Sequence, residues 1–312
     1  MGKALIWASN AGNILDICRL INQGADVDYV VKAMHEGEEM SVTPLTQAAL
    51  KDHADAVRVL ISRNADVNKP QPCNGCTALL ISAQEGYVPV MQLLISKGAR
   101  IDVRNKLGQT PLHQAAGHGQ QEAAICLLDH GADINADDNA GVTPLMYAVQ
   151  EKHLTLVDLL LIRGADPNLA ANHLEGRTAL HSASFDGLLE IAERLVEGGA
   201  NVDQVDKRGV SPLHLAAQEG RLEIVKLLAR NGANIHLANN QGVTPLQLAT
   251  LFGHNEVVDY LVNKGAKLED QGNAVARACK YCGVTDVPTM QTGTGCKVVW
   301  SCVSEEGLGG GG

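Results

Sequence analysis

Four cysteines near the C-terminal end carry the clearest chemical signal in the sequence. Cys279 and Cys282 are separated by two residues, and Cys296 and Cys302 follow with five residues between them. Two thiolates at the first spacing can form a zinc knuckle, and a structural zinc ion takes four ligands. We therefore predict that these four cysteines are the metal-ligating residues and that zinc is the cofactor; a metal-free tail is the alternative.

The other candidate nucleophiles and bases lack a catalytic context. Cys73 and Cys76 form a C-x-x-C with no second pair nearby, so we interpret it as incidental, with a redox or metal role as the alternative. The sequence contains no Gly-x-Ser-x-Gly, phosphate loop, dinucleotide-type glycine fingerprint or His-Glu-x-x-His motif. We therefore predict no catalytic residues and no enzyme activity.

Composition restricts the class of protein further. The chain has 312 residues, 45% of them hydrophobic and only 3% aromatic, so its core consists of aliphatic side chains and suits closely packed helices. This length favours several domains or a repeat array over one hydrophobic core. The net charge of −10 argues against nucleic acid as a partner. No apolar run is long enough to span a membrane, and the few cysteines indicate a reducing compartment, cytoplasmic or nuclear.

A repeat with a period of 33 to 35 residues positions most side chains. The tripeptide Thr-Pro-Leu, or a close variant, begins at Thr43, Thr77, Thr110, Thr143, Thr178, Ser211 and Thr244. Thr or Ser can cap a helix, and Pro fits the first helical turn because its φ is already helical and it has no N–H to leave unpaired. Glycines at 86, 119, 187, 220 and 253 can take the left-handed conformation that ends this first helix. A second apolar helix follows, as in residues 224–228, and the repeats must stack to bury both apolar sides.

The period and the Thr-Pro-Leu-His-x-Ala pattern, best preserved in residues 211–220, resemble the ankyrin repeat family. The resemblance implies an all-α solenoid of about eight helix-turn-helix repeats with finger loops over residues 1–270. It also implies that His113, His181 and His214, which share one repeat position, hydrogen-bond the turn. The first finger, between Asp28 and Thr43, has about seven extra residues, which we interpret as a surface insertion or an acidic contact loop.

Residues 271–304 resemble part of a MYND zinc finger, a two-zinc module found in ankyrin-repeat and MYND domain proteins. In that family's pattern the first cysteine pair matches the first two ligands, and Cys296 and Cys302 match the fourth and fifth. Gly293 and Glu306 stand where the third and sixth ligands would fall, so the finger is partial. The four cysteines could instead close around one zinc ion. Residues 305–312 are rich in glycine, and we expect them to be disordered.

The ankyrin resemblance also indicates where a partner would bind. In that family the two residues before each helix-ending glycine lie on the concave face. Here the late repeats place both phenylalanines of the chain at such positions, where large apolar groups could anchor a partner or pack on a neighbouring helix. The predicted partner-binding residues are Gln150, Glu151, Phe185, Asp186, Gln218, Glu219, Leu251 and Phe252.

We therefore expect a non-enzymatic scaffold or adaptor, a monomer, that binds other proteins through the concave face and finger loops. The alternative is a regulatory or targeting fragment of a larger enzyme or of a zinc-finger regulatory protein. A third hypothesis makes the array a substrate, because Asn68, Asn135 and Asn168 resemble the asparagines that asparaginyl hydroxylases modify in this family.

Overall fold

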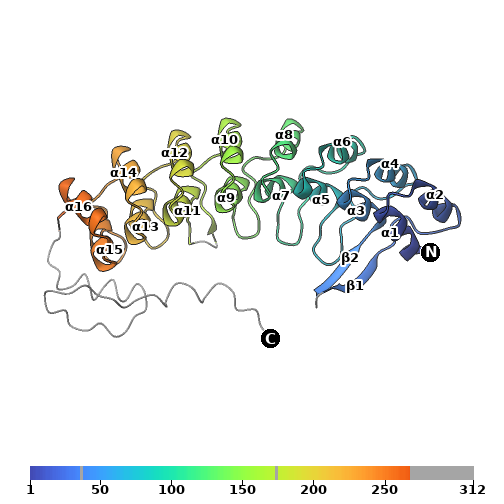
Figure 1. Ribbon diagram of the computed structural model, residues 1–312, viewed down its shortest axis with the longest axis horizontal. Helices are drawn as coiled ribbons and strands as arrows, with labels where there is room; N and C mark the ends of the chain where they lie inside the picture. The colour runs from blue at the N-terminus through green and yellow to red at the C-terminus, as the bar shows by residue number, and fades with distance from the viewer. Residues whose placement is uncertain (36–37, 173–174, 268–312) are drawn as a thin grey trace. The chain divides into compact units, whose positions relative to one another are not determined.

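The computed structural model describes residues 1–35, 38–172 and 175–267. Within these residues sixteen helices form eight helix-turn-helix pairs (Figure 1). The first helices of the pairs are α1 (Gly2–Asn10), α3 (Pro44–Leu50), α5 (Ala78–Glu85), α7 (Pro111–Gly117), α9 (Pro144–Gln150), α11 (Ala179–Asp186), α13 (Pro212–Gln218) and α15 (Pro245–Leu251). The second helices are α2 (Ile14–Asn22), α4 (Ala54–Ser62), α6 (Val88–Ser96), α8 (Gln121–Asp129), α10 (Leu154–Ile162), α12 (Leu189–Glu197), α14 (Leu222–Arg230) and α16 (Asn255–Asn263). The predicted all-α repeat fold is confirmed.

The start of each first helix follows the predicted capping chemistry. The Thr43 hydroxyl accepts a hydrogen bond from the backbone N–H of Thr46, and Pro44 occupies the first helical turn. Ser211 caps α13 in the same way through the N–H of His214. The cap supplies an acceptor to an N–H that has no partner inside the helix.

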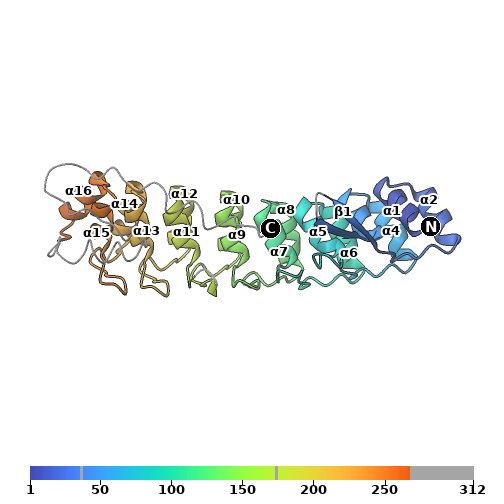
Figure 2. The ribbon, with the colours of Figure 1, turned by 90° about the horizontal axis from the view of Figure 1, so that it is seen from below.

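The repeats stack in two compact units. The first unit comprises residues 1–179 and 197–200, and the described part of the second comprises residues 180–196 and 201–267. In the first unit α1, α3, α5, α7 and α9 pack side by side in one layer, and α2, α4, α6, α8 and α10 form the other. In the second unit α13 packs on α15 and α14 on α16. In each unit the finger loops extend to one side of the helices (Figure 2).

Alanines allow the first helices to approach closely. Ala48, Ala115, Ala148 and Ala216 are fully buried between neighbouring repeats. Aliphatic side chains of the second helices, such as Leu228, complete the core. This is the packing that the low aromatic content predicts, because small and aliphatic groups leave room for closely spaced backbones. Among the described residues no helix is both long enough and apolar enough to span a bilayer.

The long first finger forms a β-hairpin that the sequence did not predict. β1 (Val31–His35) and β2 (Glu38–Val42) pair antiparallel, with Val31 opposite Val42 and His35 opposite Glu38. The base of the hairpin contacts the next finger, because the backbone N–H of Cys73 donates to the Ser41 hydroxyl at 2.7 Å. The insertion is therefore ordered at its base rather than a plain loop.

The helix-ending glycines serve two purposes at once. Gly220 has a φ of +66°, in the left-handed region. A Cβ at this glycine would also lie 2.5 Å from Nδ1 of His254, which belongs to the next repeat. The same close approach occurs between Gly119 and His153 in the first unit. Glycine is needed at these positions for its conformation and for repeat-to-repeat contact.

We predict that Gly220→Ala destabilises the protein more than Gly232→Ala. Both glycines lie in the seventh repeat and have a positive φ, but nothing lies within 4 Å of a Cβ at Gly232. The control variant, Gly232→Ala, should lose about 1 kcal/mol of unfolding free energy because alanine is strained at a positive φ. Gly220→Ala should lose about 1–3 kcal/mol more from overpacking, measured by urea denaturation. Equal losses of unfolding free energy in the two variants would contradict this prediction, because they would mean that the imidazole of His254 moves away from the added methyl group at no cost.

Candidate partner-binding surface

Six of the eight predicted partner-binding residues lie together at the C-terminal ends of three first helices in the second unit. They are Phe185 and Asp186 at the end of α11, Gln218 and Glu219 at the end of α13, and Leu251 and Phe252 at the end of α15. We refer to these six residues as the helix-end surface.

Hydrogen bonds between repeats hold the three helix ends in line. The guanidinium Nε of Arg221 donates to the backbone carbonyl of Phe185 at 3.2 Å. The imidazole Nε2 of His254 lies 2.7 Å from the backbone carbonyl of Gln218, where its N–H donates. Each donor begins the second helix of one repeat and reaches the first helix of the repeat before it. The helix-end surface is therefore built on fixed backbone rather than on loops.

The helix-end surface combines apolar and acidic groups. Phe185, Leu251 and Phe252 are half-buried, so part of each apolar side chain remains accessible, whereas Asp186 is exposed. The amide nitrogen of Gln218 donates to the carboxylate of Glu219 at 2.9 Å. The amide oxygen of Gln218 is buried and has no hydrogen-bond partner among the described residues. The surface therefore offers an apolar ledge and two carboxylates.

The remaining two predicted residues belong to the first unit. Gln150 ends α9 and Glu151 follows it, and both are exposed. Gln84 and Glu85 at the end of α5 repeat the amide-to-carboxylate hydrogen bond, at 3.1 Å. The ends of α5 and α9 in the first unit are therefore polar and lack the aromatic groups found in the second.

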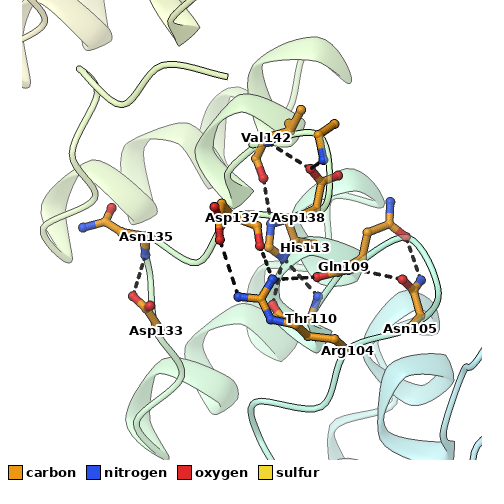
Figure 3. Close-up of polar contacts among 12 residues, drawn as sticks. Arg104, Asn105, Gln109, Thr110, His113, Asp133, Asn135, Asp137, Asp138 and Val142 are labelled. Atoms are coloured by element: carbon orange, nitrogen blue, oxygen red, sulfur yellow. Dashed lines mark hydrogen bonds and ion pairs between the residues drawn. The ribbon is translucent and has the colours of Figure 1, made fainter. Parts of the chain in front are cut away.

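The histidines at the shared repeat position are structural, as predicted. The backbone N–H of Thr110 donates to Nδ1 of His113, and Nε2 of His113 lies 3.0 Å from the carbonyl oxygen of Val142 in the next repeat (Figure 3). Because Nδ1 accepts, the ring is neutral and its proton is on Nε2. Burial lowers the pKa of His113, which agrees with this state.

His214 makes the same contacts with Ser211 and with the carbonyl oxygen of Val243, at 3.1 Å for each pair. Burial lowers its pKa from the usual 6.5 to about 4. His181 likewise places Nε2 3.0 Å from the carbonyl oxygen of Val210. With both ring nitrogens engaged, His113 and His214 are not available as a catalytic base.

Carboxylates inside the finger turns support these histidines, and sequence reasoning did not single them out. Asp138 accepts hydrogen bonds from the backbone N–H groups of Ala140 and Val142 (Figure 3). The hydroxyl of Tyr147 donates to the other oxygen of Asp138 at 2.9 Å. Burial raises the pKa of Tyr147. The turn that presents the Val142 carbonyl to the histidine is thereby held from both sides. The sequence signal is an Asp or Asn four residues before the residue that precedes the helix cap, at Asn105, Asp138, Asp206 and Asn239.

The cysteines of the second finger show no sign of activation. Cys73 is half-buried, and its Sγ lies 3.4 Å from the backbone N–H of Ser41. Burial raises the pKa of the Cys76 thiol, which makes it a poorer nucleophile. Over residues 1–35, 38–172 and 175–267 there is no group of three His, Cys, Asp or Glu side chains that could hold a metal ion. The predicted zinc ligands Cys279, Cys282, Cys296 and Cys302 lie outside the described residues, as does the glycine-rich end.

The asparagines proposed as modification sites already bond to the next repeat. The Asn68 amide nitrogen donates to the carbonyl of Gly98 at 3.1 Å, and its oxygen accepts from the N–H of Arg100 at 2.9 Å. The Asn135 oxygen accepts from the N–H of Asp166. The hydroxylation hypothesis stays a prediction.

Comparison with known protein families agrees with the repeat architecture. The family model described as "Ankyrin repeats (3 copies)" matches residues 5–105, 93–171, 169–239 and 223–287. These spans cover most of the chain, so the protein belongs to the ankyrin repeat family.

Several curated relatives share part of the array. The human "Ankyrin repeat and KH domain-containing protein 1" is 39% identical over 109 residues, which is 35% of this chain and 4% of that protein. The mouse "Ankyrin repeat domain-containing protein 17" is 51% identical over 71 residues, 22% of this chain and 3% of that protein. The Drosophila melanogaster "Ankyrin repeat and KH domain-containing protein mask" is 40% identical over 110 residues, 35% of this chain and 3% of that protein. The chain therefore matches only a small fraction of each relative's length.

We predict that His214 makes stability fall as the pH drops from about 6.5 to 4. Because its pKa is lower in the folded state, only the unfolded state takes up the proton in this window. The loss amounts to at most about 3 kcal/mol at 1.36 kcal/mol per pKa unit, and it is absent above pH 6.5. His214→Gln should flatten the pH dependence of the urea midpoint, whereas His236→Gln, at an exposed position, should not. Glutamine is a fair replacement because Gln247 occupies this position in the eighth repeat.

We predict one zinc ion per full-length chain, bound by the four tail cysteines. Metal analysis of the purified chain should find it, and Cys279→Ser and Cys296→Ser should each remove it. The pair Cys73→Ser and Cys76→Ser should leave the zinc content unchanged. A full-length chain that purifies without zinc from zinc-containing buffer would contradict the prediction.

Proposed function

We propose that the protein is a non-enzymatic interaction module and that the helix-end surface of its second unit binds the partner. Ankyrin repeats generally bind other proteins, and the chain belongs to that family. The observation that carries the proposal is the position of Phe185 and Phe252. Both are half-buried on ends of first helices, where the repeats on either side of Phe185 place Gln150 and Gln218.

The chemistry of the helix-end surface suggests the kind of segment it binds. Half-exposed aromatic groups supply most of the binding energy when a partner covers them. Asp186 and Glu219 favour a basic segment. We infer that the partner is a polypeptide segment with an apolar anchor next to a Lys or Arg. Rim charges of this kind affect the association rate and selectivity more than affinity.

A second candidate function is that the array is the targeting part of a longer polypeptide. Two observations favour it: the relatives are far longer than the matched region, and two of their names include a KH domain. Sequencing of transcripts that contain this reading frame tests the idea. A longer frame that encodes a catalytic domain would support it, and a stop codon directly after Gly312 would contradict it.

We predict that Phe185→Glu combined with Phe252→Glu abolishes partner binding while the fold is kept. Affinity purification with mass spectrometry should identify a partner with the wild-type chain and not with the double variant. Helical circular dichroism and the melting temperature should change little, because both side chains are only half-buried.

Ile162→Glu is the matched control, because Ile162 is an apolar side chain 82% exposed on α10, outside the helix-end surface. It should recover the same partner as the wild type. Recovery of the same partner by the double variant would contradict the proposal. Loss of helical signal would show that the phenylalanines are core residues.

A further inference from the structure

The outer face of the first repeat exposes a tryptophan next to a groove lined by small residues. Trp7 of α1 is 74% exposed. It lies with Ala4 and Ala8 on one stripe of that helix, and these residues and Ala11, which follows the helix, line one side of a shallow groove with a volume of about 490 Å³. The other side of the groove comes from α2. The exposed side chain of Trp7 and a groove large enough to hold such a side chain therefore lie on the same face of the repeat.

This face differs from the faces on which the other repeats stack. Asp16 is the third residue after the N-cap of α2 and lines the groove. The corresponding residue of every other repeat is apolar and buried: Ala56, Val90, Ala123, Leu156, Ile191, Ile224 and Val257. Another repeat packed here in the usual way would bury the ion pair of Asp16 and Arg19 where the other repeats bury an apolar side chain, and the desolvation of a buried ion pair can exceed its Coulombic gain. The groove is therefore a poor site for one more repeat of this array.

The charges at the edge of the groove complement each other. Arg19 lines the groove and pairs with Asp16 at 2.7 Å, and the Asn13 amide also donates to this carboxylate at 2.7 Å. A surface that contacts a copy of itself across a twofold axis must be complementary to itself. It therefore needs a protruding side chain next to a groove that can hold it, and a positive charge next to a negative one. This face has both.

We propose that two copies of the chain associate through this face as a twofold dimer. Trp7 of each copy packs into the alanine-lined groove of the other, and Arg19 pairs with the partner's Asp16. Tryptophan and arginine are the residue types that most often dominate binding energy. The groove belongs to a single helix pair, so we expect a weak, concentration-dependent dimer rather than an obligate one. The sequence predicts a monomer, and the proposed dimer departs from that prediction; no residue of the helix-end surface lines the groove.

Sedimentation velocity of the full-length chain over a concentration series tests the dimer. We expect reversible self-association that Trp7→Glu abolishes. Leu15→Glu is the control: Leu15 is an apolar residue of the same repeat, 84% exposed but outside the groove, and the variant should dimerise as the wild type does. Fluorescence in a Trp300→Phe background reports Trp7 alone, and its emission should shift to shorter wavelength as the dimer forms.

A charge exchange tests the orientation. Arg19→Glu should weaken the dimer at least tenfold, because it places like charges in contact. Adding Asp16→Arg should restore most of the affinity, because the pair is again self-complementary. A chain that stays monomeric at every concentration overturns the proposal. A dimer that survives Trp7→Glu overturns the assignment to this face.

Discussion

The repeat array depends on the contact between one helix pair and the next. A pair such as α13 and α14 has apolar side chains on both of its stacking sides, so it cannot bury them alone. Stacking covers these sides, and hydrogen bonds then fix the register: His214 reaches the carbonyl of Val243 in the finger, and His254 reaches the carbonyl of Gln218 at the helix end. At this junction two imidazoles thus tie the turn and the helix end of neighbouring repeats together.

The period made most of this fold predictable. Thr43 and Ser211 as caps, the prolines after them and the left-handed glycines such as Gly220 are local requirements, and a local requirement is visible in sequence. The β-hairpin from Val31 was not predictable in the same way, because its pairing depends on an insertion that breaks the period. The role of Asp138 was also missed, since its contact with Tyr147 joins residues that no short motif connects.

The candidate surface was predictable in position but not in detail. Counting back from each glycine correctly located Phe185, Gln218 and Phe252 at the ends of first helices. The hydrogen bonds that align those ends, from Arg221 and His254, need the three-dimensional stack, because each joins residues about one repeat apart. The outer face of the first repeat became visible only when Asp16 was compared with the buried residues at its position in the other repeats.

The central claim is that a rigid row of helix ends in the second unit binds the partner. Hydrogen–deuterium exchange of the full-length chain, with and without the partner it recovers, tests this claim most directly. We expect slowed exchange on binding to be concentrated at residues 183–187, 216–220 and 249–253. Slowed exchange confined to residues 268–312, to the finger loops or to the second helices would contradict it.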